Sequence, residues 1–208
     1  MLVDKDYRQY LELLASDSPA PGGGSVAAVN AGLASGLIQM VCSLSMDKAG
    51  LEEKEGLFKN IYREVEEFKQ YFINGVDDDA KAFTGVIQAY KLPKESNEQI
   101  AYRLKAIQEA YKEAASVPYY LGRKAHEMIS YLEELIDTCN QFAITDVSIA
   151  SMQILTSIEA SFLNVKINLS YIKDKDFVYD KEKSMDDVLK DANKRIENIK
   201  KKVEDKFL

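Results

Sequence analysis

The chain has 208 residues, of which 46% are hydrophobic and 29% are charged, a balance that excludes a disordered or fibrous protein and is typical of a globular one. Its 27 Lys and Arg residues are outnumbered by 34 Asp and Glu residues, giving a formal net charge of −7 at pH 7. Because non-specific binding to nucleic acid needs a basic surface, we expect no nucleic-acid partner. An anionic ligand would need a local pocket.

Only four Pro and ten Gly residues interrupt the sequence, and so few breaks favour long helices. In chain order, the predicted helices cover residues 4–15, 25–46, 51–90, 97–116, 118–138, 141–172 and 184–206. No segment shows the polar–apolar alternation of a strand. We therefore predict an all-α fold, a bundle of long helices forming a single domain over residues 1–208. Long amphipathic helices of this kind also favour a homodimer formed by helix packing.

The N-terminal segment lacks a basic region followed by an apolar run, so we expect no signal peptide and a cytoplasmic protein. Residues 26–46 are about as long as a membrane span, but several polar residues lie among them. Ala28, Gly32 and Gly36 repeat every four residues, which lets another helix approach closely. We predict a buried helix in the middle of the bundle and no membrane contact. A membrane-anchored helical protein is the alternative.

A glycine run, Gly22, Gly23 and Gly24, followed by Ser25, stands directly before the second predicted helix. Unpaired N–H groups and the positive end of the helix dipole can hold an anion there, and glycine lets a ligand approach the backbone. The run is not a P-loop, because no Gly-Lys-Ser/Thr follows. It is a candidate binding site, and a flexible helix start capped by Ser25 is the alternative.

Three adjacent carboxylates, Asp77, Asp78 and Asp79, lie within the long helix predicted over residues 51–90. If this helix is unbroken, its apolar stripe comprises Ile61, Val65, Phe68, Phe72, Val76, Phe83 and Val86. Asp79 falls on the stripe, whereas Asp77 points to the opposite side and Asp78 about a quarter-turn away, so those two are expected to be solvated. Burial raises the pKa of a carboxyl toward the range useful for acid–base catalysis. The alternative for Asp79 is a helix-capping or kink-stabilising role.

Polar side chains follow one edge of the apolar face of the helix predicted over residues 141–172. They are Asp146, Ser157, Asn164 and Asn168. Such a row beside an apolar stripe can hydrogen-bond a polar heterocycle held between helices. Boundary positions are also often polar without a functional reason.

Metal-ligating residues are scarce. His126 is the only histidine, and Cys42 and Cys139 belong to no zinc-binding spacing. A metal site of several imidazoles is therefore excluded, and the charged surroundings of His126 indicate a solvated face. The two cysteines are interpreted as reduced, buried thiols.

Basic residues gather near Pro93, namely Lys91, Lys94, Arg103 and Lys105. They can steer an acidic ligand toward the protein. A run of solvated surface charge is the alternative interpretation.

Separated blocks of the sequence carry a resemblance to a known family. They are the stretch from Ser18 to Ala28, Asp77-x-Asp79-Ala80-x-Ala82-Phe83, Leu92-Pro93-Lys94, Ser116-Val117-Pro118, Asn140 with Asp146, and Asn164-Val165-x-Ile167-Asn168-Leu169. With these blocks the chain resembles, over nearly its whole length, the cyclodeaminase family. That family comprises the C-terminal domain of formiminotransferase-cyclodeaminase and free-standing methenyltetrahydrofolate cyclohydrolases.

The resemblance implies an all-helical homodimer that acts on a tetrahydrofolate one-carbon unit without metal, flavin or nicotinamide. It makes Asp79 the general acid/base, the residue that the helical stripe also singles out. It implies that the polar or anionic end of the folate is bound by Gly22, Gly23, Gly24 and Ser25, and that the pterin pocket is formed or supported by Asn140, Asp146, Asn164 and Asn168.

The expected activity is that of a formiminotetrahydrofolate cyclodeaminase, and methenyltetrahydrofolate cyclohydrolase is the alternative. The substrate is a tetrahydrofolate derivative in its mono- or polyglutamylated form. A third hypothesis is a non-catalytic helical binding or assembly module, which predicts a solvated Asp79 and no cavity beside the glycine run. Asp79, Gly23 and Asn164 lining one cleft would count against that module.

Overall fold

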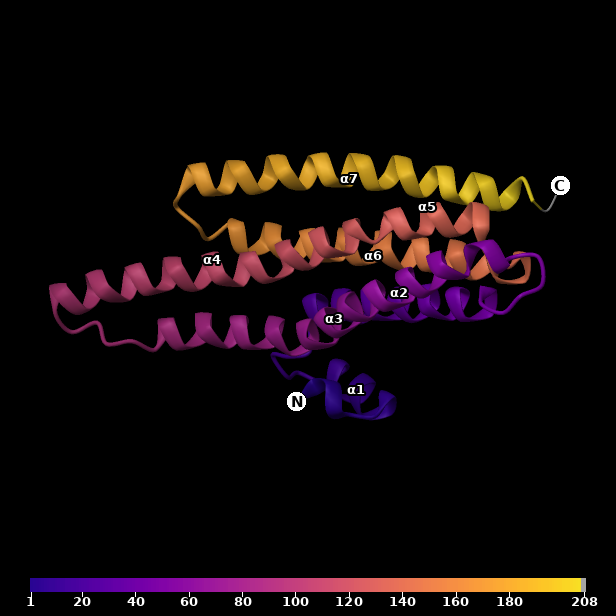
Figure 1. Cartoon of the computed structure of the whole chain (residues 1–208). Coiled ribbons are helices and arrows are strands. Elements are labelled where there is room, and N and C mark those ends of the chain that lie inside the picture. The colour runs from indigo at the N-terminus through magenta and orange to yellow at the C-terminus, as the bar shows by residue number, and fades with distance from the viewer. Residues whose placement is uncertain (207–208) are drawn as a thin grey trace.

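The computed structural model describes residues 1–206 and is built of helices (Figure 1). The α-helices are α1 (Tyr7–Leu14), α2 (Gly23–Ser45), α3 (Glu55–Tyr90), α4 (Asn97–Glu127), α5 (Ile129–Thr138), α6 (Ile144–Leu169) and α7 (Lys175–Glu204). Short 3-10 helices lie at Leu2–Asp4, Glu52–Lys54 and Gln141–Ala143. No strand occurs in the described residues, and the all-α prediction is confirmed.

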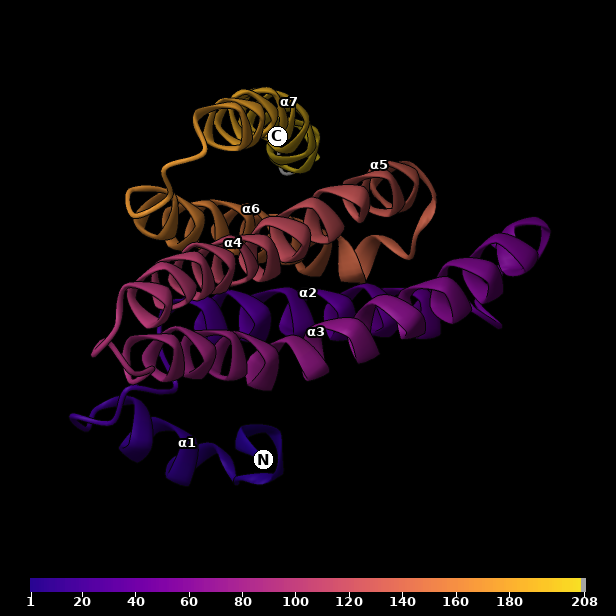
Figure 2. The ribbon, with the colours of Figure 1, turned by 90° about the vertical axis from the view of Figure 1, so that its left-hand side faces the viewer.

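Four long helices, α2, α3, α4 and α6, form the central bundle. α2 packs against α3 and α6, and α4 packs against the same two helices from the other side. Figure 2 shows this arrangement, with α7 lying over α6 and α1 set apart below α2 and α3. Neighbouring helices run antiparallel, as at α2 and α6, where Gly23 lies beside Asn164 and Leu44 bonds to Asn140.

One face of α2 is the most deeply buried surface of the bundle, and Ala27, Ala31, Ala34, Ile38 and Val41 are fully buried there. Among the described residues, Gly23–Ser45 is the one helix long and apolar enough to cross a membrane, with 56% of its most apolar window buried inside the protein. The predicted position in the middle of the bundle is confirmed for this face.

The opposite face of α2 is only loosely covered by residues 1–206, with the N-terminal segment across a cavity near its start. A methyl group added at Gly32 or Gly36 would meet nothing within 4 Å, and Leu33, Met40 and Leu44 are exposed along the same side. Among residues 1–206, the expected close approach of another helix is made at Ala28, which faces Gly75 of α3, and not at Gly32 or Gly36. α2 is buried on one side only.

The prediction placed a boundary between two helices, 97–116 and 118–138, at Pro118. The structure has no boundary there. α4 continues through Pro118, and the chain breaks at Met128 instead. Proline has no N–H to donate to the carbonyl four residues earlier, that of Ala114. The Asn168 side chain donates to this carbonyl at 3.0 Å. A neighbouring helix therefore replaces the missing hydrogen bond and lets α4 run on.

α7 starts nine residues before the predicted position, at Lys175 rather than Ser184. Its N-cap is Asp174, whose carboxylate accepts a hydrogen bond from the Phe177 N–H. Ser184 lies within the helix and accepts a hydrogen bond from the Tyr119 hydroxyl at 2.8 Å. The capping residue was missed because the first turns of α7 are too polar to show an apolar period.

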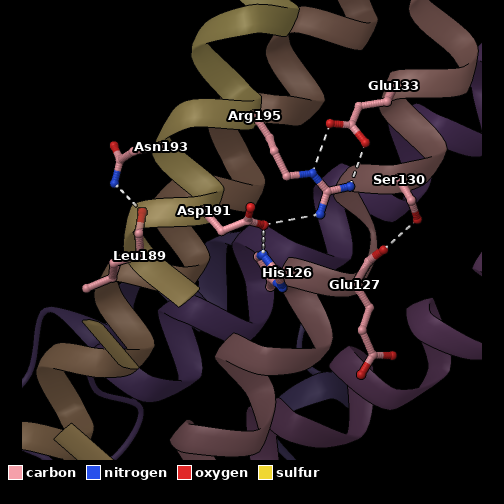
Figure 3. Close-up of polar contacts among 8 residues, drawn as sticks. All are labelled: His126, Glu127, Ser130, Glu133, Leu189, Asp191, Asn193 and Arg195. Atoms are coloured by element: carbon pink, nitrogen blue, oxygen red, sulfur yellow. Dashed lines mark hydrogen bonds and ion pairs between the residues drawn. The ribbon is translucent and has the colours of Figure 1, made fainter. Parts of the chain in front are cut away.

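His126 belongs to an ion-pair network on the solvent-facing side of the bundle, as its charged surroundings predicted (Figure 3). Its Nε2 lies 2.7 Å from Asp191 of α7, and Arg195 bonds to Glu133 of α5 through two nitrogens at 2.9 and 2.6 Å. His126 lowers the pKa of the Asp191 carboxyl. The network joins α7 to α4 and α5, which gives His126 a structural position away from the glycine run.

Candidate functional site

The candidate site lies at the N-terminus of α2, which begins at Gly23 and not at residue 25 as predicted. The N-cap is Gly22, which has no side chain to accept a hydrogen bond from the first turn. The early N–H groups of a helix lack carbonyl partners within the helix. Ser25 is no cap, because its hydroxyl donates to the Val76 carbonyl of α3 at 2.7 Å. The first turn of α2 is thereby held against α3.

Side chains of other helices lie against the backbone at two glycines of this turn. A Cβ atom built on Gly24 would lie 2.0 Å from an Asp79 carboxylate oxygen, and one on Gly23 would lie 3.0 Å from the Asn164 amide nitrogen. A side chain at Gly24 would therefore displace the Asp79 carboxylate, whereas one at Gly23 would make only a tight contact with Asn164. The two glycines thus bring Asp79 of α3 and Asn164 of α6 to the same end of α2.

Asp79 is partly buried, and its pKa is raised by that burial, while a hydrogen bond from the Ser25 backbone lowers it and only partly offsets the burial. A carboxylate is also favoured at the positive end of a helix. The position therefore fits both hypotheses made from the sequence, a proton-transfer group and a helix-capping aspartate. Among residues 1–206, no group of three His, Cys, Asp or Glu side chains is arranged to hold a metal ion.

Asp77 differs from its prediction, because it is 6% exposed rather than solvated. One carboxylate oxygen accepts a hydrogen bond from the Leu2 N–H at 2.6 Å, and the other has no partner within the described residues. The helical wheel was correct about direction, but the N-terminal segment covers that side of α3. Asp77 therefore attaches the start of the chain to the bundle.

The two asparagines of α6 near the site are used differently. The Asn164 amide nitrogen donates to the Ala160 carbonyl of its own helix at 2.8 Å, and its oxygen has no hydrogen-bond donor among residues 1–206, while both atoms lie against the backbone of Gly23. The Asn168 amide donates to both Ala114 and Asn164 carbonyls. Asn164 is thus placed to contact a ligand through its oxygen. The nitrogen of Asn168 is not available to a ligand, because it donates to the Ala114 carbonyl that Pro118 leaves without a donor.

Asn140 and Asp146 lie at the opposite end of the bundle. Asp146 is in the first turn of α6, and the 18 residues from there to Asn164 correspond to about 27 Å of helix. Asn140 donates to the Leu44 carbonyl at the C-terminus of α2 and caps the short helix that follows. Within one chain, these two residues therefore cannot line the same pocket as Asn164, contrary to the predicted grouping.

Tyr10 of α1 is a neighbour of the site that the sequence analysis missed. Its hydroxyl is buried without a hydrogen-bond partner in the described residues. Burial and the nearby Asp79 carboxylate both raise the pKa of Tyr10. Buried hydroxyls are nearly always hydrogen-bonded. No local pattern could have identified this residue, because α1 is brought to the bundle by the chain as a whole.

An apolar cavity of about 400 Å³ adjoins Tyr10, between the N-terminal segment and helices α2 and α3. Asp79 is not among its lining residues, which are Leu2, Val3, Lys5, Tyr7, Tyr10, Ala28, Val29, Gly32, Leu33, Phe72, Ile73 and Val76. Gly23 and Asn164 are not among its lining residues either, so this cavity is not the cleft expected to join Asp79, Gly23 and Asn164.

Comparison with known proteins assigns the chain to a family. Residues 6–187 match the family model described as formiminotransferase-cyclodeaminase. The chain belongs to the formiminotransferase-cyclodeaminase family. The family predicted from the separated sequence blocks is therefore confirmed, and with it the expectation of a folate one-carbon enzyme family.

The similar proteins include both a methenyltetrahydrofolate cyclohydrolase and cyclodeaminases, the two activities expected from the sequence. Methenyltetrahydrofolate cyclohydrolase of Methylorubrum extorquens is 33% identical, with 98% of this chain and 100% of that protein covered. Formimidoyltransferase-cyclodeaminase of Gallus gallus is 31% identical over 85% of this chain, which spans only 32% of that longer protein. The crystal structure of formiminotetrahydrofolate cyclodeaminase from Thermotoga maritima superposes with a TM-score of 0.81, at 28% identity, over 99% of this chain and 96% of that one.

Proposed function

We propose that this protein is a cytoplasmic enzyme that acts on the bridging one-carbon unit of a tetrahydrofolate, as a formiminotetrahydrofolate cyclodeaminase. The observation that carries the proposal is the Asp79 carboxyl, partly buried, raised in pKa and pressed against Gly24 at the start of α2. A non-catalytic module predicts a solvated Asp79, so its partial burial favours an enzyme.

In the proposed reaction, N10 of the folate attacks the formimino carbon carried on N5. The new N10–C bond forms, the carbon becomes tetrahedral, and the C–N bond to the formimino nitrogen then breaks. The formimino group reacts as its protonated amidinium, N5–CH=NH2⁺, so attack by N10 leaves an –NH2 group on the tetrahedral carbon. Asp79 accepts the proton that N10 loses and gives it to this –NH2 group, which leaves as ammonia while the positive charge stays on the methenyl product. A carboxyl whose pKa is raised by burial can perform both transfers. The product is 5,10-methenyltetrahydrofolate, and the protein's own part consists of proton transfer and orientation.

The start of α2 supplies the orienting groups. N–H groups of the first turn, at the positive end of the helix dipole, bind polar or anionic atoms of the pterin. Gly22, Gly23, Gly24 and Ser25 are the residues of this turn, and the Asn164 oxygen accepts a hydrogen bond from the ligand. The reaction transfers protons, forms one C–N bond and breaks another, and it includes no oxidation or reduction. We therefore expect turnover without added metal, flavin or nicotinamide.

A methenyltetrahydrofolate cyclohydrolase is the second candidate, because the match to such an enzyme spans both chains almost end to end. In that reaction water adds to the methenyl carbon, and opening of the ring gives 10-formyltetrahydrofolate. Supplying 5-formimino- or 5,10-methenyl-tetrahydrofolate separates the two reactions by ammonia release or by loss of the methenyl absorbance. Inactivity of a folded, folate-binding protein with both compounds would reject the enzyme.

We also propose that the protein is a homodimer that pairs through the outer faces of α2 and α6. Exposed apolar side chains line both helices, namely Leu33, Met40, Leu44, Ile149, Met152, Leu163 and Ile167. Helices α2 and α6, about 34 and 39 Å long, together present roughly 700 Å² when they lie side by side, close to the roughly 800 Å² per partner of a standard interface. α2 carries no charged residue to oppose this contact.

An antiparallel dimer would also explain the position of Asp146. Asp146 and Asn164 point in the same direction from α6, because 18 residues complete five turns. A twofold axis across the middle of α6 therefore brings the partner subunit's Asp146 to the glycine turn. Mixing inactive Asp79→Asn and Asp146→Asn proteins tests this arrangement. Partial recovery of activity in the mixed dimer supports a shared site, and a fully active Asp146→Asn protein contradicts it.

A further inference from the structure

Beyond the first turn of α2, the bundle continues with three helices instead of four. Asp79 and Tyr90 of α3 are 11 residues apart, which places Tyr90 about 16 Å farther along and within about 20° of the same face. Tyr171 lies in the turn that follows α6, which ends at Leu169, and its ring stacks on Tyr111 of α4. The end of α3 and the segment after α6 therefore meet at α4, beyond the glycine turn.

A cavity of about 450 Å³ lies at that position. It is formed by the end of α3, the first half of α4 and the segment after α6, and its lining residues are Tyr90, Arg103, Leu104, Lys105, Ile107, Gln108, Tyr111, Tyr171 and Lys173. The rings of Tyr111 and Tyr171 are stacked with centroids 4.8 Å apart, and Tyr90 meets Tyr111 edge-on. One wall is therefore aromatic.

Three cations border this aromatic wall in a protein of net charge −7. Arg103, Lys105 and Lys173 form no salt bridge within residues 1–206, whereas the nearby Lys112 is paired with Asp174 at 2.8 Å. Unpaired cations gathered in a cavity of an acidic protein favour an anionic ligand.

The position of the Arg103 guanidinium is fixed by the protein. It donates from two nitrogens to the Tyr90 carbonyl, at 3.2 and 3.0 Å, and lies 5.4 Å from the centre of the Tyr90 ring. Donors that remain on the guanidinium can bind a carboxylate, for which this group is geometrically suited. Gln108 holds the opposite wall, because it bonds to the Tyr171 carbonyl and to the Lys173 N–H.

We propose that this cavity binds the glutamate tail of the folate substrate, with Arg103, Lys105 and Lys173 contacting its carboxylates and the tyrosines packing on its apolar parts. The inference rests on the proposed function, because it takes the pterin to lie at the glycine turn. It converts the basic cluster predicted from the sequence into a specificity site. Of that cluster, Arg103 and Lys105 line the cavity, whereas Lys91 and Lys94 are not among its lining residues.

The test is the affinity of the double variant Lys105→Gln, Lys173→Gln for three ligands, measured by calorimetry without turnover. The ligands are tetrahydrofolate monoglutamate, its pentaglutamate and a tetrahydropterin that lacks the tail. Two partly solvated charge contacts together correspond to roughly a tenfold change in Kd. We expect the pentaglutamate to bind about tenfold more weakly, the monoglutamate to lose less, and the tail-less pterin to bind as before.

Arg103→Lys is the second variant, because it keeps the charge but removes the forked donor, and it should weaken the tailed ligands by a smaller factor. The matched control is Lys190→Gln, Lys194→Gln on the exposed side of α7, which removes the same charge elsewhere. Equal loss in this control, equal loss for the tail-less pterin, or unchanged affinity for the pentaglutamate would each overturn the tail site.

The same measurement separates this inference from the proposed activity. If the wild type binds the pentaglutamate in a manner that depends on Lys105 and Lys173 but turns over neither folate, the tail site stands and the proposed reaction fails. If turnover occurs and the variants bind like the wild type, the reaction stands and the tail site fails. Absence of any folate binding rejects both.

Discussion

The two ends of α2 are built in opposite ways. At the C-terminal end, polar groups satisfy one another: Asn140 donates to Ser45 and Leu44, and its side chain accepts from Phe142. At the N-terminal end, Gly22 supplies no cap, and a buried tyrosine hydroxyl nearby has no partner in the described residues. Both ends are bonded to neighbouring elements, the N-terminal one through Ser25 and α3, but the N-terminal end has no side-chain cap and lies near a hydroxyl without a partner in the described residues. This difference distinguishes a structural terminus from a candidate site.

The largest expected effect comes from Asp79→Asn. General acid–base catalysis contributes about 10²–10⁴ in rate, so we expect a loss of that size in kcat. Asparagine can still accept the backbone hydrogen bond at the start of α2, so the fold should persist. Spectrophotometric turnover of 5,10-methenyltetrahydrofolate and ammonia release measure the loss.

The same variant has a signed effect on stability. Because the pKa of folded Asp79 is raised, the folded state binds more protons than the unfolded state between the two pKa values, and stability falls as pH rises through the folded value. The Asn variant lacks this loss. Its Tm should equal or exceed that of the wild type at neutral pH, and a large decrease would show that the carboxylate is needed for folding.

Gly24→Ala should have the next largest effect. The added methyl group must displace the Asp79 carboxylate, and a displacement of about 1 Å at a catalytic group can cost about 10² in rate. Gly56→Ala is the matched control, because a methyl group there meets nothing within 4 Å. We expect the control to keep full activity, and similar rates for the two variants would remove Gly24 from the site.

Asn140→Ala tests the opposite end of α2. Loss of its side-chain hydrogen bonds should reduce the free energy of unfolding by about 1–2 kcal/mol, measured by urea denaturation. The nitrogen of the Asn140 amide donates to Leu44 and its oxygen accepts from Phe142, so both are bonded within the chain. We therefore expect kcat of the folded variant to be unchanged. A selective loss of activity with unaltered stability would return Asn140 to the substrate pocket.

Tyr10→Phe should give the smallest effect. The change removes only the hydroxyl that lacks a partner in the described residues, so stability should stay within about 0.5 kcal/mol of the wild type or improve slightly. If the hydroxyl bonds the bound folate, KM should rise severalfold with little change in the unfolding midpoint. An unchanged KM would make Tyr10 a packing residue only.

Much of the fold follows from the sequence because helices have a local signature. The apolar stripe of α3 correctly predicted a helix unbroken through Gly75 and the partial burial of Asp79, although Phe83 of the same stripe is 45% exposed. Boundaries were less accurate where the cause lies in another element. Pro118 was expected to end a helix, and it does not, because Asn168 of α6 supplies the missing donor.

The candidate site was predictable in part for the same reason. The contact between Gly24 and Asp79 follows from sequence blocks that each carry a pattern. The position of Asp77 could not be predicted, because the helical period says nothing about what covers a face. The separation of Asp146 from Asn164 was overlooked for a different reason. Side chains on one edge of a long helix point in the same direction, but they can lie far apart along the helix axis.

The bond from Asn168 to the Ala114 carbonyl has a mechanical consequence. It fixes the position of α6 along α4. A shift of α6 by even one turn would leave the Ala114 carbonyl buried without a hydrogen-bond donor. Asn164, one turn away on the same helix, is therefore held next to Gly23. A proline that would ordinarily weaken a helix here fixes the alignment on which the glycine turn depends.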